Sequence, residues 1–245
     1  MDGIGQQFVE MTKYHKMGRS DYGRGVLQPP VELDWDRAKA LLPLPSHKEA
    51  ALGDVALRAI IDQRRSLREY AESPISQEEL SFLLWCTQGI QQVVPGSRTG
   101  RTVPSAGARH AFETLVLANN VTDLPVGLYR YVATKHALVE ENLSPGIAAR
   151  IVEACLGQEF LARSNVTFIW VAVAYRMTYR YGERGYRYLY LDAGHVCQNL
   201  YLAAEAIGCG ACAVAAFSDD DVNRVLRLDG REQFAIYVGA VGKKP

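Results

Sequence analysis

Three arginines and one serine lie within five consecutive positions, at Arg64, Arg65, Ser66 and Arg68. A guanidinium group is a planar fork that bonds two phosphate oxygens at once, and a serine hydroxyl adds a neutral donor. No acidic residue interrupts the run before Glu69. The segment is therefore a candidate phosphate site, and a solvated run of surface charge is the alternative.

A second pattern, in residues 186–217, predicts a long helix with one polar stripe. Apolar residues recur at helical spacing, while Asp192, His195 and Asn199 lie three and four positions apart on another face. Gly208 ends the helix, and mostly small side chains follow it. Small residues allow the backbone to approach a flat ligand, but a core helix with a hydrogen-bonded histidine explains the same pattern.

The residues after this helix match short sequence motifs of other cofactor and metal sites. Residues 208–213 read G-x-G-x-x-A, but a dinucleotide fingerprint requires a strand, a glycine turn and then a helix, and here a helix comes first. Cys209 and Cys212 form a single C-x-x-C, and no second pair supplies the remaining ligands of a zinc site. A redox pair would belong at a helix N-terminus. We therefore exclude the fingerprint and disfavour zinc or redox chemistry at these cysteines.

Histidine and serine patterns give no support to metal or hydrolytic chemistry. His110 and His136 stand alone in the sequence, so a metal site would need convergence from distant segments, and we predict none. His195 could be a ligand or a base, but a hydrogen-bonded group on the polar stripe is the simpler interpretation. The chain also lacks the G-x-S-x-G elbow of serine hydrolases.

The composition is that of a globular protein without a general electrostatic partner. The 245 residues carry 27 basic and 27 acidic side chains, so no overall field attracts nucleic acid or an anionic membrane. Residues 1–10 contain no secretory apolar region, and the five cysteines then predict a cytoplasmic protein with free thiols. The longest apolar run, residues 168–175, is far shorter than the roughly 20 residues that span a bilayer.

Helix and strand patterns alternate along the chain. Ser76 and Glu79 form a capping box for a helix that Gly89 closes. Residues 166–175 form a continuous β-rich run, typical of a strand covered on both faces. The other predicted elements are a short helix over 55–61, strands 112–117 and 127–131 that pair across a turn-rich loop, a helix from Ser144 and Pro145 to near Ser164, a strand-like run after Gly208, a short helix capped by Ser218 and Asp221, and a last strand over 233–241. The paired strands argue against a purely parallel sheet and favour an α+β fold.

The first 45 residues mix glycine, proline and charge without a long period. Such a composition predicts an arm with little structure of its own, laid over a surface. We therefore divide the chain into an N-terminal arm, residues 1–50, and one domain, residues 51–245.

Three separated segments, residues 64–70, 104–110 and 194–217, resemble those of the nitroreductase-like flavoproteins and occur in the order typical of that family. The likeness covers residues 50–245 and is closest to the SagB-type dehydrogenase branch, whose leader the arm also resembles. The resemblance implies a three-layer α-β-α fold of the α+β class with a central mixed, mainly antiparallel sheet. It also implies a homodimer that binds FMN non-covalently at its interface, with a small molecule or a peptide as substrate.

The same resemblance assigns roles to residues of this chain. Flavin N5 would pass electrons from NAD(P)H to a nitroaromatic or quinone-type acceptor by a ping-pong route. The phosphate and ribityl chain would be held by Arg64, Arg65, Ser66 and Arg68, with Lys243, or alternatively Lys244, adding charge. The remaining cofactor contacts would come from Pro104, Ser105, Ala106 and Gly107, which pack on the ring bound by the partner subunit, and from the backbone of Cys209, Gly210, Ala211, Cys212 and Ala213.

Two alternatives remain open. A relative of this branch oxidises azolines in peptides and uses a Lys-Tyr pair as base, whereas this chain has Arg187 and Tyr188 at the corresponding place. An arginine stays protonated, so Tyr188 is the only candidate catalytic side chain for such a reaction, and only if its environment is strongly perturbed. The other alternative is a flavin-binding protein without turnover, because fold does not fix function.

Overall fold

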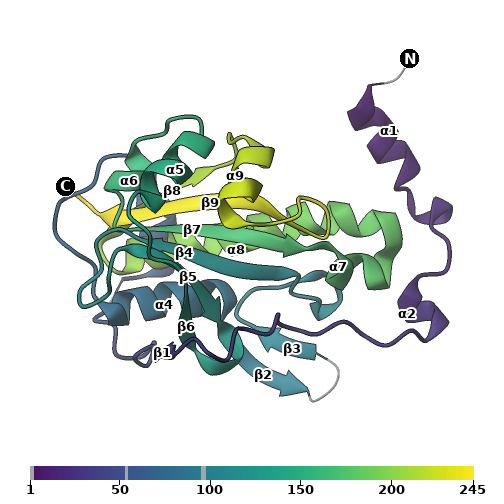
Figure 1. The fold of residues 1–245 in the computed structure, drawn as a ribbon, viewed down its shortest axis with the longest axis horizontal. Coiled ribbons are helices and arrows are strands. Elements are labelled where there is room, and N and C mark those ends of the chain that lie inside the picture. Colours follow the sequence, from purple (N-terminus) through teal and green to yellow (C-terminus); the bar gives the residue numbers. More distant parts are fainter. Residues whose placement is uncertain (1–2, 53–54, 95–97) are drawn as a thin grey trace.

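The computed structural model describes residues 3–52, 55–94 and 98–245, which form three layers around a central sheet (Figure 1). Parts of the predicted arm and domain, at residues 1–2, 53–54 and 95–97, lie outside the described residues. The helices are α1 (Ile4–Met11), α2 (Asp21–Arg24), α3 (Leu57–Gln63), α4 (Gln77–Gln88), α5 (Ile147–Ala154), α6 (Phe160–Arg163), α7 (Ala174–Tyr181), α8 (Gly185–Ala206) and α9 (Asp219–Leu226). The strands are β1 (Leu41–Pro43), β2 (Ile90–Val94), β3 (Arg98–Arg101), β4 (Phe112–Ala118), β5 (Gly127–Val132), β6 (Ala137–Asn142), β7 (Val166–Val173), β8 (Cys209–Val214) and β9 (Gln233–Lys243).

The main sheet has seven strands in the order β1-β6-β5-β4-β7-β9-β8, and each neighbouring pair is antiparallel. An isolated parallel bridge joins Ser66 to Ala211 at the β8 edge. The predicted α+β class and mainly antiparallel sheet are therefore confirmed. β2 and β3 form a separate two-stranded antiparallel sheet, in a stretch where no strand was predicted.

Two hydrophobic cores lie on opposite faces of the sheet, because both faces of the central strands are apolar. Phe168 and Trp170 of β7 belong to the core under α4 and α8, whereas Ile169 and Val171 belong to the core under α5, α6 and α9. This alternation is the period of two that a strand imposes. Figure 1 shows α5, α6 and α9 on one side of the sheet and α4 on the other.

The two helices on which the site depends form as predicted. In α4 the Ser76 hydroxyl accepts a hydrogen bond from the Glu79 amide, and the Glu79 carboxylate accepts one from the Ser76 amide, which completes the capping box. α8 is 22 residues long, and Gly208 follows it with a φ of 69°. Gly239 of β9 leaves room for α8, since a Cβ there would lie 2.8 Å from a methyl carbon of Leu200.

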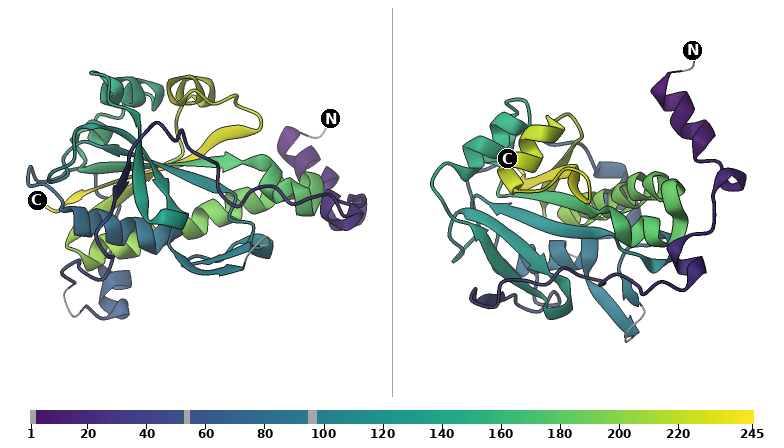
Figure 2. Two further views of the ribbon diagram at one scale, coloured as in Figure 1. Left: turned by 60° about the horizontal axis from the view of Figure 1, so that its bottom comes forward. Right: turned by 45° about the vertical axis from the view of Figure 1, so that its right-hand side comes forward.

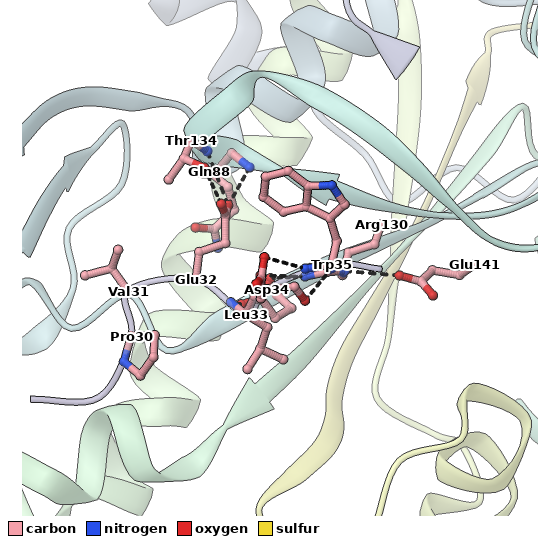
Figure 3. Close-up of polar contacts among 12 residues, drawn as sticks. Pro30, Val31, Glu32, Leu33, Asp34, Trp35, Gln88, Arg130, Thr134 and Glu141 are labelled. Carbon is pink, nitrogen blue, oxygen red and sulfur yellow. Dashed lines mark hydrogen bonds and ion pairs between the residues drawn. The ribbon is translucent and has the colours of Figure 1, made fainter. Parts of the chain in front are cut away.

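The arm crosses the body of the domain and is held by arginine side chains of the domain (Figure 2). Arg176 Nε donates to the Pro30 carbonyl at 2.8 Å, and Arg130 donates to the carbonyls of Leu33 and Asp34 at 3.1 and 3.0 Å. Figure 3 shows this part of the arm beside Arg130 and Glu141. β1 then adds to the edge of the main sheet beside β6.

Three predictions about elements were wrong in detail. The arm has structure of its own, since α1 and α2 form in it and α1 projects away from the body (Figures 1 and 2). The helix expected from Ser144 to Ser164 is broken into α5 and α6, because Leu156 and Gly157 adopt positive φ, and its N-cap is Gly146. The strand expected over 166–175 ends at Val173, where α7 begins.

None of the helices within residues 3–52, 55–94 and 98–245 is both long and apolar enough to cross a bilayer.

Candidate functional site

Arg64, Arg65, Ser66 and Arg68, which we call the cation cluster, follow α3 and lie at the surface beside the end of the sheet. Within the described part of the chain, none of the three guanidinium groups forms an ion pair with a carboxylate. Arg65 donates only to backbone carbonyls, of Asp62 at 2.9 Å and of Arg64 at 2.8 Å. Arg64 and Arg68 lie over the rings of Tyr201 and Phe160. Three adjacent positive charges without a counter-charge fit a phosphate dianion.

The cation cluster is joined to β8 through the backbone. The Leu67 amide donates to the Ala211 carbonyl at 2.9 Å, next to the bridge between Ser66 and Ala211. Tyr201 of α8 reinforces this contact, because its hydroxyl lies 3.0 Å from the Ser66 hydroxyl and accepts a hydrogen bond from the Ala213 amide at 2.8 Å. Two of the predicted segments are thus brought together, although Ser66 and Ala211 are 145 positions apart in the sequence.

The small residues of β8 serve the packing of this junction. A Cβ on Gly210 would lie 2.4 Å from a methyl carbon of Leu67, so only glycine fits there. Cys209, Gly210, Ala211 and Cys212 are buried, and Ala213 is half-buried. Of the five β8 residues predicted to face the flavin, Ala213 therefore offers the most accessible surface.

Both lysines proposed at the phosphate are already paired with carboxylates. Lys243 Nζ contacts Glu79 of α4, and Lys244 Nζ lies 2.5 Å from Glu205 of α8. Lys243 is nevertheless close to the junction, because it pairs with Cys209 across β8 and β9 and its carbonyl accepts from the Ala71 amide. Its charge is thus partly neutralised, unlike those of the cation cluster.

The loop Pro104–Gly107, which we call the small-residue loop, lies against the first half of α8. The Ala106 amide donates to Asp192 Oδ1 at 3.2 Å, and the Ser105 hydroxyl accepts from the His110 amide at 2.9 Å. Gly107 has a φ of 60°, and a Cβ there would lie 2.6 Å from the Tyr181 hydroxyl. The loop is therefore fixed by α7 and α8 rather than free.

The small-residue loop and the cation cluster do not meet within one subunit. The loop contacts Asp192 of α8, and the cluster contacts Tyr201 of the same helix. These two positions are nine residues apart, which is about 13 Å at the rise of an α-helix. The chain therefore presents two candidate half-sites along one helix. A ligand that touches both must either span this distance or lie between two subunits.

The predicted candidate base is engaged by a neighbouring arginine. Arg184 Nε donates to the Tyr188 hydroxyl at 2.7 Å, and the Tyr181 ring packs edge-on against Tyr188. Arg187 is directed to the arm, where it donates to the Thr12 hydroxyl at 2.5 Å. Tyr188 thus lies near the small-residue loop, whereas Arg187 holds the arm.

The cysteines and histidines form no alternative centre. Burial raises the pKa of the Cys209 thiol to about 12 and also raises that of Cys212, so neither is a reactive thiolate at neutral pH. All five thiols are free. Among the residues that the structure describes, no three histidine, cysteine or acidic side chains gather as metal ligands.

A cavity of about 360 Å³ lies away from both half-sites, between the arm and the outer face of the sheet. Trp35, Arg130 and Val225 are among the residues that line it, and none of the predicted cofactor residues, all of which the structure describes, does so. Its volume alone therefore does not identify the site.

Sequence analysis missed two residues of the site. Tyr201 had no signal, because its role depends on the contact of two distant segments. Asp192 had one, since the polar stripe of α8 required a polar partner, but its partner in the small-residue loop could not be read from spacing. His195, on the same stripe, is exposed.

Comparison with known proteins identifies the family of this chain. Residues 61–243 match the model of the Nitroreductase family. A protein of Methanocaldococcus jannaschii described as a nitroreductase is 34% identical over 203 residues, 83% of this chain and 96% of that protein. The microcin B17-processing protein McbC of Escherichia coli is 27% identical over 143 residues, 56% of this chain and 52% of its own length.

A solved structure shares the fold. A protein of Anabaena variabilis described as a nitroreductase is similar with a TM-score of 0.70 at 26% identity, over 85% of this chain and 42% of that one. The family match covers most of this chain, including the cation cluster, the small-residue loop and β8. The chain therefore belongs to the nitroreductase family and is an oxidoreductase of that family.

Proposed function

We propose that this protein is an FMN-dependent oxidoreductase that works as a homodimer, with NAD(P)H as reductant and a nitroaromatic or quinone-type acceptor. The cation cluster carries the proposal, because three arginines within five positions have no carboxylate partner in the described ranges. A phosphate supplies the charge that these groups lack. The family match supports a redox cofactor as the molecule that bears this phosphate.

The residues of the chain would bind and orient the cofactor. When bound, FMN would supply hydride chemistry at its N5 atom for two half-reactions that share one site. Arg64, Arg65 and Arg68 hold the phosphate by charge-assisted hydrogen bonds, and the Ser66 hydroxyl adds a contact oriented by Tyr201. The edge of β8 around Ala213 faces the ring. Lys243 contributes less, because Glu79 already accepts its charge.

The second half-site would come from the partner subunit. Tyr190 and Leu191 of α8 are 61% and 60% exposed, on a face that also carries the exposed Gly194. A groove of about 320 Å³ between α4 and α8, lined in part by Phe82 and Leu202, adds apolar surface beside that face. Contact between two such faces about a two-fold axis brings the small-residue loop of one subunit toward the cation cluster of the other.

A peptide azoline dehydrogenase is the second candidate, and the similarity to the microcin B17-processing protein favours it. The contacts of Arg187 and Tyr188 count against it. Arg187 is held by the arm and Tyr188 accepts from Arg184, so neither side chain is poised to take a proton.

Absorbance of the purified protein separates these candidates. We expect a yellow protein whose visible flavin band bleaches with NAD(P)H and returns with a nitroaromatic or quinone. Bleaching by an azoline peptide but not by a nicotinamide would favour the second candidate. Bound flavin that no donor reduces would indicate a flavin-binding protein without turnover, and a protein with no affinity for FMN would contradict all three.

A further inference from the structure

Asp192 is a buried carboxylate that is only half satisfied. Its side chain lies on the inner face of α8, the residue is 3% exposed, and its Oδ1 accepts from the Ala106 amide at 3.2 Å. Its Oδ2 is buried and has no hydrogen-bond partner. Burial raises the pKa of Asp192, against the opposing effects of the Ser105 hydroxyl, the Ala106 amide and His195. A buried oxygen without a hydrogen-bond partner destabilises a folded protein, so its presence calls for an explanation.

The backbone that ends the small-residue loop and directly follows it is strained. Gly107, Ala108 and His110 have φ values of 60°, 52° and 43°, so three of four consecutive residues adopt the left-handed region. Two of these residues are not glycine, and such backbone persists only where the surroundings enforce it. Strained backbone thus directly follows the small-residue loop, which contacts the half-satisfied carboxylate. Both are typical of a segment kept in one conformation for binding.

We infer that Asp192 is a positioning residue of the cofactor site, which acts through the Ala106 amide to hold the small-residue loop in the conformation that receives the flavin ring. The inference rests on the proposed function, because it takes the loop to be a flavin contact. Asp192 does not touch the cofactor, since its free oxygen is enclosed by protein. An acidic residue suits this role because a carboxylate binds a backbone amide more strongly than a neutral acceptor does.

The variant Asp192→Asn separates this role from a structural one, because the two roles predict different changes in the stability of the FMN-free protein. A structural role predicts a loss of stability, and a positioning role predicts none. The amide keeps an acceptor for Ala106 but removes the buried charge, so the FMN-free protein should be as stable as the wild type or more stable. The weaker acceptor should loosen the loop and raise the Kd of FMN by about tenfold. The matched control is Asp220→Asn on α9, which removes an exposed carboxylate and should change neither quantity.

The experiment measures urea unfolding of the FMN-free protein and FMN affinity by fluorescence titration for the wild type, Asp192→Asn, Ser105→Ala and the double variant. The inference is supported if Asp192→Asn keeps the stability of the wild type but binds FMN more weakly. It is also supported if the effects of Asp192→Asn and Ser105→Ala on the Kd of FMN are less than additive in the double variant. An unchanged Kd, or a loss of stability that matches the loss of affinity, overturns it while leaving the proposed function intact. A wild type without affinity for FMN overturns the proposed function and this inference together.

Discussion

The hydroxyl groups of Ser66 and Tyr201 lie 3.0 Å apart, although 135 positions separate the two residues. The Tyr201 hydroxyl also accepts from the Ala213 amide, so one side chain of α8 connects the cation cluster to the edge of β8. The candidate phosphate contact and the candidate ring contact are thus parts of one hydrogen-bonded unit. Disturbing Tyr201 should therefore affect both.

Replacing Tyr201 by Phe removes both hydrogen bonds while keeping the ring under Arg64. The Ala213 amide is half-buried, so its loss of a partner should lower the free energy of unfolding by about 1 kcal/mol. FMN affinity should fall several-fold, measured by fluorescence titration. Tyr14→Phe, at a residue of the arm that is 76% exposed, is the control, and equal effects of the two substitutions would contradict a role for Tyr201 at the site.

Replacing Arg68 by Ala should weaken FMN binding while the fold persists. A hydrogen bond to a charged group contributes about 1.5 to 3 kcal/mol, which corresponds to at least a tenfold rise in Kd. Lys243→Ala should weaken binding less and destabilise the protein more, because it leaves the carboxylate of Glu79 unpaired. The exposed Arg58, whose nearest carboxylate oxygen in Asp62 is 3.8 Å away, gives the control variant Arg58→Ala. Unchanged retention of flavin in Arg68→Ala would remove Arg68 from the site.

The arm should depend on Glu113, the buried acid beneath it. Glu113 accepts from Arg176 at 2.5 Å and from the Leu33 amide at 2.8 Å, and Arg130 lies 3.5 Å away. Glu113→Gln leaves the buried Arg176 without its counter-charge and leaves Arg130 with Glu141 alone, so it should lower the free energy of unfolding by about 3 kcal/mol. Urea denaturation measures this loss. Glu10→Gln, in an exposed ion pair, should change it by less than about 1 kcal/mol, and similar values for both variants would show that the arm is not held by this network.

Folding stability should fall as the pH drops below neutrality, because the structure keeps His110 uncharged. Burial, together with Arg101 and Arg109, lowers the pKa of His110 from its ordinary 6.5 to about 3. Below pH 6.5 the unfolded chain binds a proton at His110, whereas the folded chain does not. The contribution of His110 to the free energy of unfolding is therefore fully present above pH 6.5 and is lost as the pH falls toward 3. Between pH 7.5 and 5.5 the loss is about 1.4 kcal/mol from this residue.

The variant His110→Asn tests this contribution, since Asn tolerates the left-handed backbone at this position. Its free energy of unfolding should depend less steeply on pH than that of the wild type. His195→Asn replaces an exposed histidine and should keep the wild-type dependence. Identical pH dependence in all three proteins would contradict a neutral His110 in the folded state.

Local patterns predicted the elements of this protein better than they predicted its site. The capping box of Ser76 and Glu79 and the apolar run of β7 depend on neighbouring residues, and both were confirmed. The break between α5 and α6 was not predicted, because the positive φ of Leu156 has no marker in the sequence apart from the following glycine. Local patterns thus fix elements more reliably than their boundaries.

Long-range contacts explain what spacing could not predict. The sequence marked the cation cluster and the small residues of β8 as separate candidates, and the structure joins them through Ala211 and Tyr201. The glycine of β8 was expected to admit a ligand, yet Gly210 admits Leu67. The small-residue loop was expected to contact the same cofactor. Within one subunit, however, it contacts Asp192, which is nearer the start of α8 than Tyr201 at the cation cluster.

Mixed dimers test most directly whether one FMN lies between the cation cluster of one subunit and the small-residue loop of its partner. One subunit would carry Arg64→Ala, Arg65→Ala and Arg68→Ala, and the other Ala106→Trp, which blocks the loop. Each variant alone should bind no FMN, whereas a mixed dimer has one site in which both contributing segments are unchanged. We predict one FMN per mixed dimer with wild-type affinity, measured by titration of the purified mixed species. A mixed dimer that binds no FMN would contradict a site shared between subunits.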